Sequence, residues 1–272
     1  MSILYIDKSD CVIGKQDNRI TVKYKDGMVR TIPVESIDGI TLLGHAQVTT
    51  QCIQECLKKG ISLSYFSKGG HYFGRLSSTG HIKASLQRKQ AGLYDQPFAL
   101  ELSKKIIFAK IHNQIVVLRR YSKCTNHNIS DIELHMKSAL RKVNYVKSIE
   151  ELMGYEGSAA KYYFKGLSIC IDDAFKFEGR SKRPPRDAFN SMLSLGYSIL
   201  MNELYGEIEI KGLNAYFGFL HRDAEKHPTL ASDMMEEWRA VLIDSTVMSM
   251  INGHEVHIDE FYSDDGEGVY IS

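Results

Sequence analysis

The feature that most constrains the fold of this chain is a change of residue pattern between residues 80 and 95. Before it, short β-type runs alternate with turn residues, and after it the apolar residues recur at helical spacing. Only two of the five prolines lie outside residues 184–228, so little interrupts helices in the second part. The pattern predicts an α+β multidomain protein with an N-terminal small β-sandwich domain (1–80), a connector (81–97) and a larger all-α domain (98–272).

The first part carries repeated strand signals. The alternating run 19–24, the Asp26-Gly27 turn and the apolar run 29–34 together predict a hairpin. A helix is expected over 49–60, where the closing glycine is a stop signal. The predicted strands span residues 3–7, 11–14, 19–24, 29–34, 39–44, 61–67 and 71–76.

The second part is predicted to be a set of apolar helices. In the first of them, isoleucine, valine and leucine recur near the helical period, which is typical of a helix packed into a core. Asp187 precedes another, where its carboxylate can cap the helix. The predicted helices span residues 104–120, 132–143, 150–175, 189–206 and 229–253.

Composition places the chain among globular proteins, with 43% hydrophobic and 25% charged residues. The five cysteines are scattered and form no C-x-x-C pair, so we expect reduced thiols and no zinc site. No run is apolar for long enough to cross a membrane, and the first residues lack a secretory pattern. We therefore expect a cytoplasmic protein that does not associate with a membrane.

The net charge is only +1, but the charges are unevenly distributed. Residues 101–147 contain ten Lys or Arg and three Asp or Glu, whereas residues 255–267 contain six acids and no Lys or Arg. This asymmetry can place a basic face on a neutral protein, as a phosphate backbone requires. The alternative is that these charges only solvate helix surfaces.

Two isolated side chains of the second part are candidate metal ligands. Glu156 lies between Gly154 and Gly157 in a helical run, and such glycines suggest close backbone approach or ligand access. His221 follows an apolar, aromatic run. The alternatives are a solvated glutamate and a hydrogen-bonded core histidine.

A cluster of acids is the third candidate. Asp233, Glu236 and Glu237 lie three or four residues apart, on one face of a predicted helix. Clustered acids near an apolar stripe repel one another unless a cation offsets them, although an exposed acidic face is the simpler explanation. Carboxylates combined with one histidine suit Mg²⁺ or Mn²⁺, and such a site serves phosphodiester chemistry.

The segment GRSKRPPRDAFNSML (179–193) is strongly basic in its first half and is stiffened there by two adjacent prolines. Guanidinium groups bind phosphates in a bidentate manner, so the segment is a candidate phosphate clamp or a solvated loop. The candidate DNA-binding residues are Arg180, Lys182, Arg183 and Arg186.

The chain resembles the CRISPR-associated protein 1 family over nearly its whole length. The resemblance rests on GYEGSAAKYYF, RSKRPPRDAFNSMLSLGY and GLNAYFGFLHRDAEKHPTLASDMMEEWR, in this order. It implies that Glu156, His221 and Glu236 are the catalytic and metal-binding residues. Asp233 would lie beside the metal as a supporting or alternate ligand. Many relatives carry aspartate in place of Glu236.

The resemblance also implies a function and partners. The first domain would form a homodimer, and the helical domain would be a metal-dependent DNA endonuclease and integrase of CRISPR adaptation, an antiviral defence. It would join 3′-OH ends of a captured double-stranded DNA fragment to CRISPR repeat DNA, together with CRISPR-associated protein 2, a small ferredoxin-like adaptation partner. Two other functions remain open: a non-catalytic DNA-binding structural protein and a branched-DNA repair nuclease.

Overall fold

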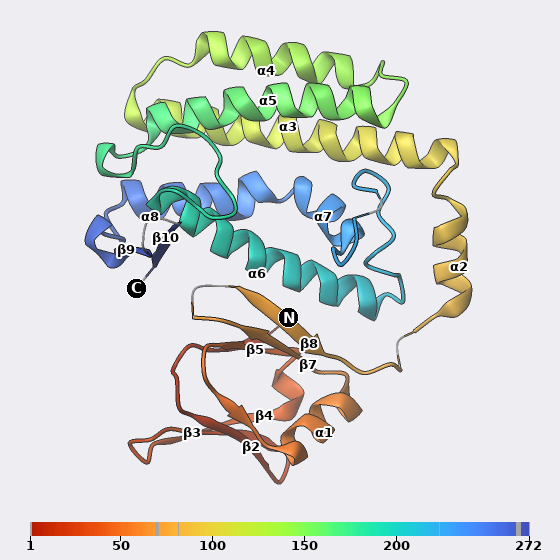
Figure 1. Ribbon diagram of the computed structural model, residues 1–272, viewed down its shortest axis with the longest axis vertical. Helices are drawn as coiled ribbons and strands as arrows, with labels where there is room; N and C mark the ends of the chain where they lie inside the picture. The colour runs from red at the N-terminus through yellow and green to blue at the C-terminus, as the bar shows by residue number, and fades with distance from the viewer. Residues whose placement is uncertain (1, 69–70, 81, 223, 265–267, 272) are drawn as a thin grey trace. The chain divides into compact units, whose positions relative to one another are not determined.

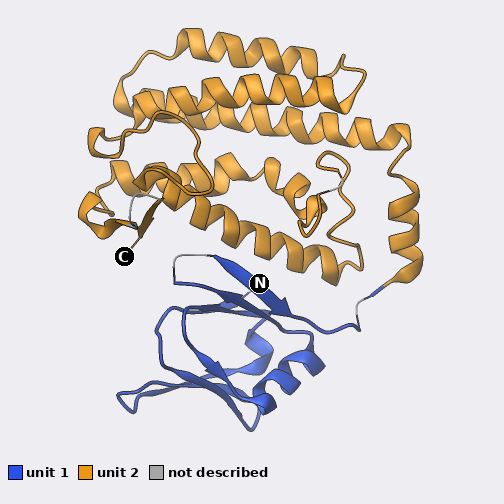
Figure 2. Ribbon diagram, viewed as in Figure 1, with its two compact units in different colours: residues 1–82 blue, residues 83–272 orange. Residues whose placement is uncertain are grey.

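The computed structural model describes residues 2–68, 71–80, 82–222, 224–264 and 268–271. The chain divides into two compact units, residues 1–82 and 83–272 (Figure 2). The first unit holds eight of the strands and the second is mostly helical, so the predicted mixed fold with strands first is confirmed (Figure 1).

The first unit contains two four-stranded sheets. One has the order β1 (Ile3–Ile6), β5 (Gly39–Leu43), β7 (Ser62–Phe66) and β8 (Tyr72–Leu76); the other has the order β4 (Val29–Pro33), β3 (Arg19–Lys23), β2 (Val12–Gln16) and β6 (Gln47–Val48). Strands β1, β5 and β7 run parallel, whereas β2, β3 and β4 are antiparallel. Each predicted strand run overlaps a strand, although β2 extends two residues beyond the run predicted over 11–14, and the predicted hairpin is β3–β4.

The helix α1 (Thr50–Lys59) completes this unit. Thr49 caps it by accepting a hydrogen bond from the Cys52 N–H (3.3 Å), and Gly60 ends it in the left-handed conformation (φ 75°), as its position predicted. Cys52 and Cys56 are fully buried and join the apolar core that both sheets share. The thiols are free.

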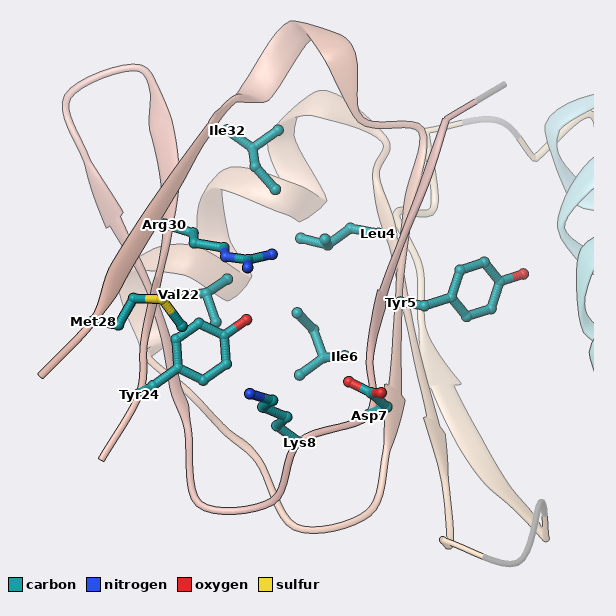
Figure 3. A pocket seen from close by; sticks show the side chains of 10 residues that line it. All are labelled: Leu4, Tyr5, Ile6, Asp7, Lys8, Val22, Tyr24, Met28, Arg30 and Ile32. Atoms are coloured by element: carbon teal, nitrogen blue, oxygen red, sulfur yellow. The ribbon is translucent and has the colours of Figure 1, made fainter. Parts of the chain in front are cut away.

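A cavity of about 190 Å³ lies beside this core, between β1 and the β3–β4 hairpin (Figure 3). Its lining mixes apolar side chains with charged ones. They are Leu4, Tyr5, Ile6, Asp7, Lys8, Val22, Tyr24, Met28, Arg30 and Ile32. The two sheets therefore do not close completely around their core at this place.

The second unit is built from long helices. They are α2 (Ala84–Gly92), α3 (Pro97–Thr125), α4 (Ser130–Val143), α5 (Ile149–Cys170), α6 (Ala188–Ile210), α7 (Thr229–Glu236) and α8 (Ser245–Asn252). Short 3₁₀ turns span Val34–Ser36 in the first unit and Asp173–Phe175 and Ile258–Glu260 in the second. Helices α3, α4 and α5 lie side by side, and α3 also packs against α7 (Figure 1).

Local signals account for where these helices begin. Ser148 accepts a hydrogen bond from the Glu151 N–H (3.2 Å) at the start of α5. Asp187 accepts one from the Asn190 N–H (2.8 Å) at the start of α6, which confirms the cap predicted there. The apolar faces of these helices then form one large core.

Three details differ from the predictions. The second unit is not all-α, because β9 (Phe261–Asp264) and β10 (Gly268–Ile271) form an antiparallel pair. The helix expected over 229–253 is interrupted by a π-helical segment, Arg239–Asp244. Residues 83–97 of the segment expected as a connector carry α2 and belong to the second unit.

The residue types of the β9–β10 hairpin explain why these two segments form strands. Phe261, Tyr262, Val269, Tyr270 and Ile271 are aromatic or β-branched, and these residue types favour strands. The Val269 N–H donates to the Pro185 carbonyl (2.8 Å), so β10 also ties down the proline-rich loop.

Within the described residues, no helix combines the length and apolar character that a membrane span requires.

Candidate metal centre

Three helices of the second unit bring the candidate ligands together. Glu156 projects from α5 and Glu236 from the last residue of α7, while α3 passes between them. The Asn113 side chain of α3 donates to the Glu237 carbonyl (2.8 Å), which ties α3 to the end of α7. Residues 80 positions apart in sequence therefore share one site.

A lysine joins the two carboxylates. The Lys110 ammonium on α3 forms ion pairs with Glu156 and with Glu236 Oε2 (2.5 Å). Lys110 and Glu236 are only 7% and 3% exposed, so these charges lie away from bulk water. Burial alone would lower the pKa of Lys110, but Glu236 and Glu156 outweigh it and hold that pKa above its usual value.

Glu156 lies on an unbroken helix. The glycines on either side of it do not mark a close backbone contact, because a Cβ at Gly154 or Gly157 would meet no neighbouring described atom within 4 Å. The prediction of close approach is therefore wrong. Both glycines are exposed, and helix positions one or two residues away from Glu156 face other directions, so this open space is at the surface of α5.

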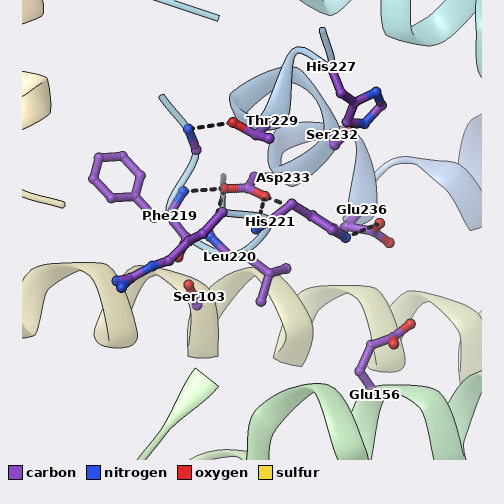
Figure 4. A network of polar contacts seen from close by, with 12 residues as sticks. Ser103, Glu156, Phe219, Leu220, His221, His227, Thr229, Ser232, Asp233 and Glu236 are labelled. Carbon is purple, nitrogen blue, oxygen red and sulfur yellow. Dashed lines mark hydrogen bonds and ion pairs between the residues drawn. The ribbon is translucent and has the colours of Figure 1, made fainter. Parts of the chain in front are cut away.

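Asp233 is fully buried and uses both of its oxygens (Figure 4). Oδ2 accepts from the backbone N–H groups of Phe219 (2.6 Å) and Leu220 (2.9 Å), and Oδ1 accepts from the His221 N–H (2.9 Å). The carboxylate thus fixes the loop before α7. This arrangement favours Asp233 as a supporting residue over Asp233 as a direct metal ligand, because both of its oxygens already accept hydrogen bonds.

His221 is oriented by the same carboxylate. Its Nδ1 lies 2.9 Å from Asp233 Oδ1, and an ionised carboxylate only accepts, so Nδ1 carries the proton. In the neutral imidazole Nε2 then keeps a lone pair. Nε2 lies 4.0 Å from Glu236 Oε1, which places a nitrogen ligand beside the two carboxylates.

The loop that carries His221 depends on Gly218. A Cβ at Gly218 would lie 2.7 Å from the Thr229 carbonyl carbon and 2.9 Å from the Leu230 nitrogen. The Gly218 N–H donates to Thr229 Oγ1 (2.9 Å), which holds the loop against the first turn of α7. Only glycine allows this close approach.

Glu236 lies among positive charges. Besides Lys110, Arg239 approaches Oε1 at 3.2 Å. Burial opposes ionisation, yet Lys110 and Arg239 outweigh it and lower the pKa of Glu236 to about 2. The buried Oε2 is ion-paired with the Lys110 ammonium and has no other polar partner among the described residues. That oxygen has coordination capacity left.

A second buried acid lies behind Arg239. Asp244 accepts hydrogen bonds from Tyr163 (2.9 Å) and Tyr197 (2.5 Å), and burial raises its pKa to about 6 although both bonds oppose the shift. The Arg239 guanidinium lies over the Tyr197 ring, 5.0 Å from its centroid. The π-helical segment thus places Arg239 at the site and Asp244 beneath it.

The predicted basic segment divides into two parts. Arg180 points inward and donates to Asn190 Oδ1 (2.8 Å) and Ser194 Oγ (3.2 Å). Its guanidinium also lies over the Tyr197 ring, 5.3 Å from the ring centroid. Its guanidinium is therefore engaged within the fold. The remaining candidates for DNA contact, Lys182, Arg183 and Arg186, are exposed.

The candidate ligands fit a divalent cation in their chemistry. Glu156 and Glu236 share one positive charge, and Glu236 Oε2 has no polar partner except Lys110 among the described residues. Together with the lone pair of the His221 imidazole, these carboxylates form the mixed oxygen and nitrogen set that suits Mg²⁺ or Mn²⁺. As they stand, no three His, Cys, Asp or Glu side chains of the described residues lie close enough to hold an ion. The Lys110 ammonium lies between the carboxylates instead.

Lys110, Arg239 and the Asp244 network were not predicted from the sequence. One signal for Lys110 was present, because it shares the helical stripe of Ile106, Ile107 and Ile111, where a charge must be paired. Arg239 follows Glu236 by three residues, a spacing that brings side chains together on a helix. Nothing in the sequence indicated the tyrosine partners of Asp244, because they lie 81 and 47 positions away.

The fold and the site define a two-unit protein whose helical unit holds a buried cluster of two carboxylates, an ammonium and an imidazole. The family described as CRISPR associated protein Cas1 matches residues 4–272. The chain therefore belongs to this family.

Individual proteins that are similar to this chain support the family assignment. The chain is 43% identical over 249 residues to the CRISPR-associated endonuclease Cas1 of Mycobacterium tuberculosis, covering 91% of this chain and 73% of that protein. A CAS1 protein from Thermotoga maritima has the same fold, with a TM-score of 0.86 at 23% identity, covering 100% of this chain and 85% of the other. A Cas6-RT-Cas1–Cas2 complex matches with a TM-score of 0.83 at 26% identity, covering 100% of this chain and 30% of that one.

Proposed function

We propose that this protein is a metal-dependent DNA endonuclease and integrase of CRISPR adaptation. It joins the 3′-OH ends of captured double-stranded DNA to the repeat of a CRISPR array by transesterification. Membership of the family and relatives named as endonucleases support the activity. The observation that carries the proposal is the meeting of Glu156 and Glu236, from separate helices, at one positive charge beside His221 Nε2.

In this proposal Glu156, His221 and Glu236 hold Mg²⁺ or Mn²⁺. The ion, when bound, supplies charge stabilisation for the transferring phosphate and the leaving 3′-oxygen. Asp233 keeps the proton on His221 Nδ1, so that Nε2 remains available. Arg239 adds a fixed positive charge close to Glu236, where a phosphate can be bound.

We also propose partners for this protein. The Cas6-RT-Cas1–Cas2 complex contains a chain similar to this one, which supports the small adaptation protein as a partner. A homodimer through the first unit and contact of Lys182, Arg183 and Arg186 with DNA complete the proposal. We place the protein in the cytoplasm, where its DNA substrates are.

An integration assay tests this function. Supercoiled plasmid with a CRISPR repeat is mixed with a short duplex and Mn²⁺, and joined products are counted. Glu156→Ala, His221→Ala and Glu236→Ala should each lose at least on the order of 100-fold in rate, because the ion supplies several kcal/mol of stabilisation. Asp173→Asn, whose side chain is 97% exposed, is the matched control.

The same assay separates the alternative functions. A non-catalytic DNA-binding protein would bind duplex in a salt-dependent manner and would not respond to metal. A branched-DNA repair nuclease would need the same ligands but would prefer branched duplex to the repeat plasmid. Wild-type joining by Glu156→Ala, or joining in excess chelator, would remove the metal site from the reaction.

A further inference from the structure

The Lys110 side chain occupies an unusual position for a lysine. It lies on the buried stripe of α3, and its ammonium contacts Glu156 on one side and Glu236 on the other. Both carboxylates are candidate ligands of the proposed metal. The ammonium therefore lies between the same groups that the metal would have to join.

The electrostatics of this cluster require a cation. Two carboxylates brought together in a buried place repel each other, and removal of their partner leaves uncompensated charge in a medium of low polarity. Arg239 reaches only Oε1 of Glu236, and no contact joins it to Glu156 among those the structure describes. Lys110 is the group that links the two acids.

We propose that Lys110 is a positioning residue that holds the place of the divalent cation. In the metal-free protein its ammonium keeps Glu156 and Glu236 facing one another, and metal binding exchanges one cation for another. The inference rests on the proposed function, because it takes the same two carboxylates as ligands. Lys110 thereby sets how tightly the ion is bound.

The exchange has a consequence that a purely structural role does not have. If the ammonium competes with the metal, its removal must strengthen metal binding while it weakens the metal-free fold. A lysine that only supported the helices would weaken both. Metal affinity and metal-free stability therefore move in opposite directions in this proposal.

Lys110→Met tests the inference, because methionine keeps much of the side-chain volume and removes the charge. Free Mn²⁺ is titrated by electron paramagnetic resonance, and thermal unfolding is recorded with and without Mn²⁺. We expect Mn²⁺ to bind about tenfold more tightly than in the wild type. The melting temperature should be lower without metal, and the rise on Mn²⁺ addition should be larger.

A matched control lies on the same helix. Lys104 also forms an ion pair, with Glu101 at 2.8 Å, but this carboxylate is 64% exposed and is not a candidate metal ligand. Lys104→Met should leave Mn²⁺ affinity unchanged. If Lys104→Met tightens Mn²⁺ binding as much as Lys110→Met does, the effect is one of total charge and the inference is overturned.

Lys110→Met has a defined outcome even if it does not fold without metal. It should then fold in Mn²⁺, and Lys110→Met/Glu156→Gln should fold without metal, because one charge of each sign is gone. Failure of both rescues overturns the inference, as does equal or weaker Mn²⁺ binding by a folded Lys110→Met.

Two further variants keep this test separate from that of the function. Glu156→Ala and Glu236→Ala should each weaken Mn²⁺ binding. If they do not, the metal site itself is wrong and the proposed function fails with it. If they weaken binding but Lys110→Met does not strengthen it, only the role of Lys110 is overturned.

Discussion

At the scale of single residues, Asp233 has two roles, whereas the sequence predicted only a position beside the metal. Its two oxygens accept from three backbone N–H groups and from the His221 ring. It therefore builds the loop and selects the imidazole tautomer at once. The resemblance to the family located this aspartate, but only the fold shows that its lone pairs are already used.

Asp233→Asn tests this double role. The amide nitrogen of asparagine cannot accept, so buried N–H groups lose partners and the free energy of unfolding should fall by about 1 to 3 kcal/mol. Mn²⁺ affinity should fall about 10- to 100-fold, because His221 loses its orienting partner. Urea unfolding and Mn²⁺ titration measure the two effects. Unchanged Mn²⁺ affinity in a folded variant would contradict the assignment.

Asp244 predicts a pH dependence of stability. Its pKa is raised from 3.8 to about 6 by burial, so the folded state holds a proton that the unfolded state has already lost. This contribution is present in full below pH about 4 and is lost as pH rises through about 6. The difference in unfolding free energy, wild type minus Asp244→Asn, should therefore fall by on the order of 2 kcal/mol between those limits.

Denaturant unfolding at pH values from 4 to 7 measures that difference. The constant effect of the lost tyrosine hydrogen bond cancels, because only the slope with pH is compared. A difference that rises with pH would mean that Asp244 is ionised more readily in the fold than in water.

At the scale of elements, the close approach of the 215–221 loop to α7 depends on one glycine. Gly218→Ala forces a Cβ to within 2.7 Å of the Thr229 backbone, so the loop must move and carry His221 with it. We expect a loss of stability of about 1 to 3 kcal/mol and weaker Mn²⁺ binding. Thermal unfolding and metal titration check both.

Gly157→Ala is the matched control for that substitution. Its Cβ would enter open space on an exposed turn of α5, and alanine favours a helix over glycine. Stability should therefore rise by up to about 1 kcal/mol. If Gly157→Ala destabilises the protein as much as Gly218→Ala, the argument from close approach is wrong.

Predictability also differs between elements. The β3–β4 hairpin was predictable because Asp26-Gly27 and the alternating strands are local signals. The β9–β10 pair was overlooked, since its strands are short and follow a long helical region. The π-helical segment 239–244 could not be predicted, because apolar spacing near 3.6 residues does not reveal one extra residue in a turn.

At the scale of the whole molecule, the order of the two units could be predicted from the sequence, but the contacts that assemble the site could not. Glu156, His221 and Glu236 were candidates from the sequence alone, but only the family resemblance selected them as one set, since each residue alone has a simpler explanation. Their meeting depends on α3, which separates α5 from α7 and supplies Lys110. Such a contact between three helices is a property of tertiary packing and leaves no local pattern.

The central claim is that two acids and one imidazole from distant segments ligate a single cation. Crystals grown with Mn²⁺ and measured near the manganese absorption edge test it most directly. We predict one anomalous peak within about 2.0 to 2.3 Å of Glu156, Glu236 and His221 Nε2, with the Lys110 ammonium displaced from between the carboxylates. A peak bound elsewhere, or none beside these three side chains at saturating Mn²⁺, would contradict it.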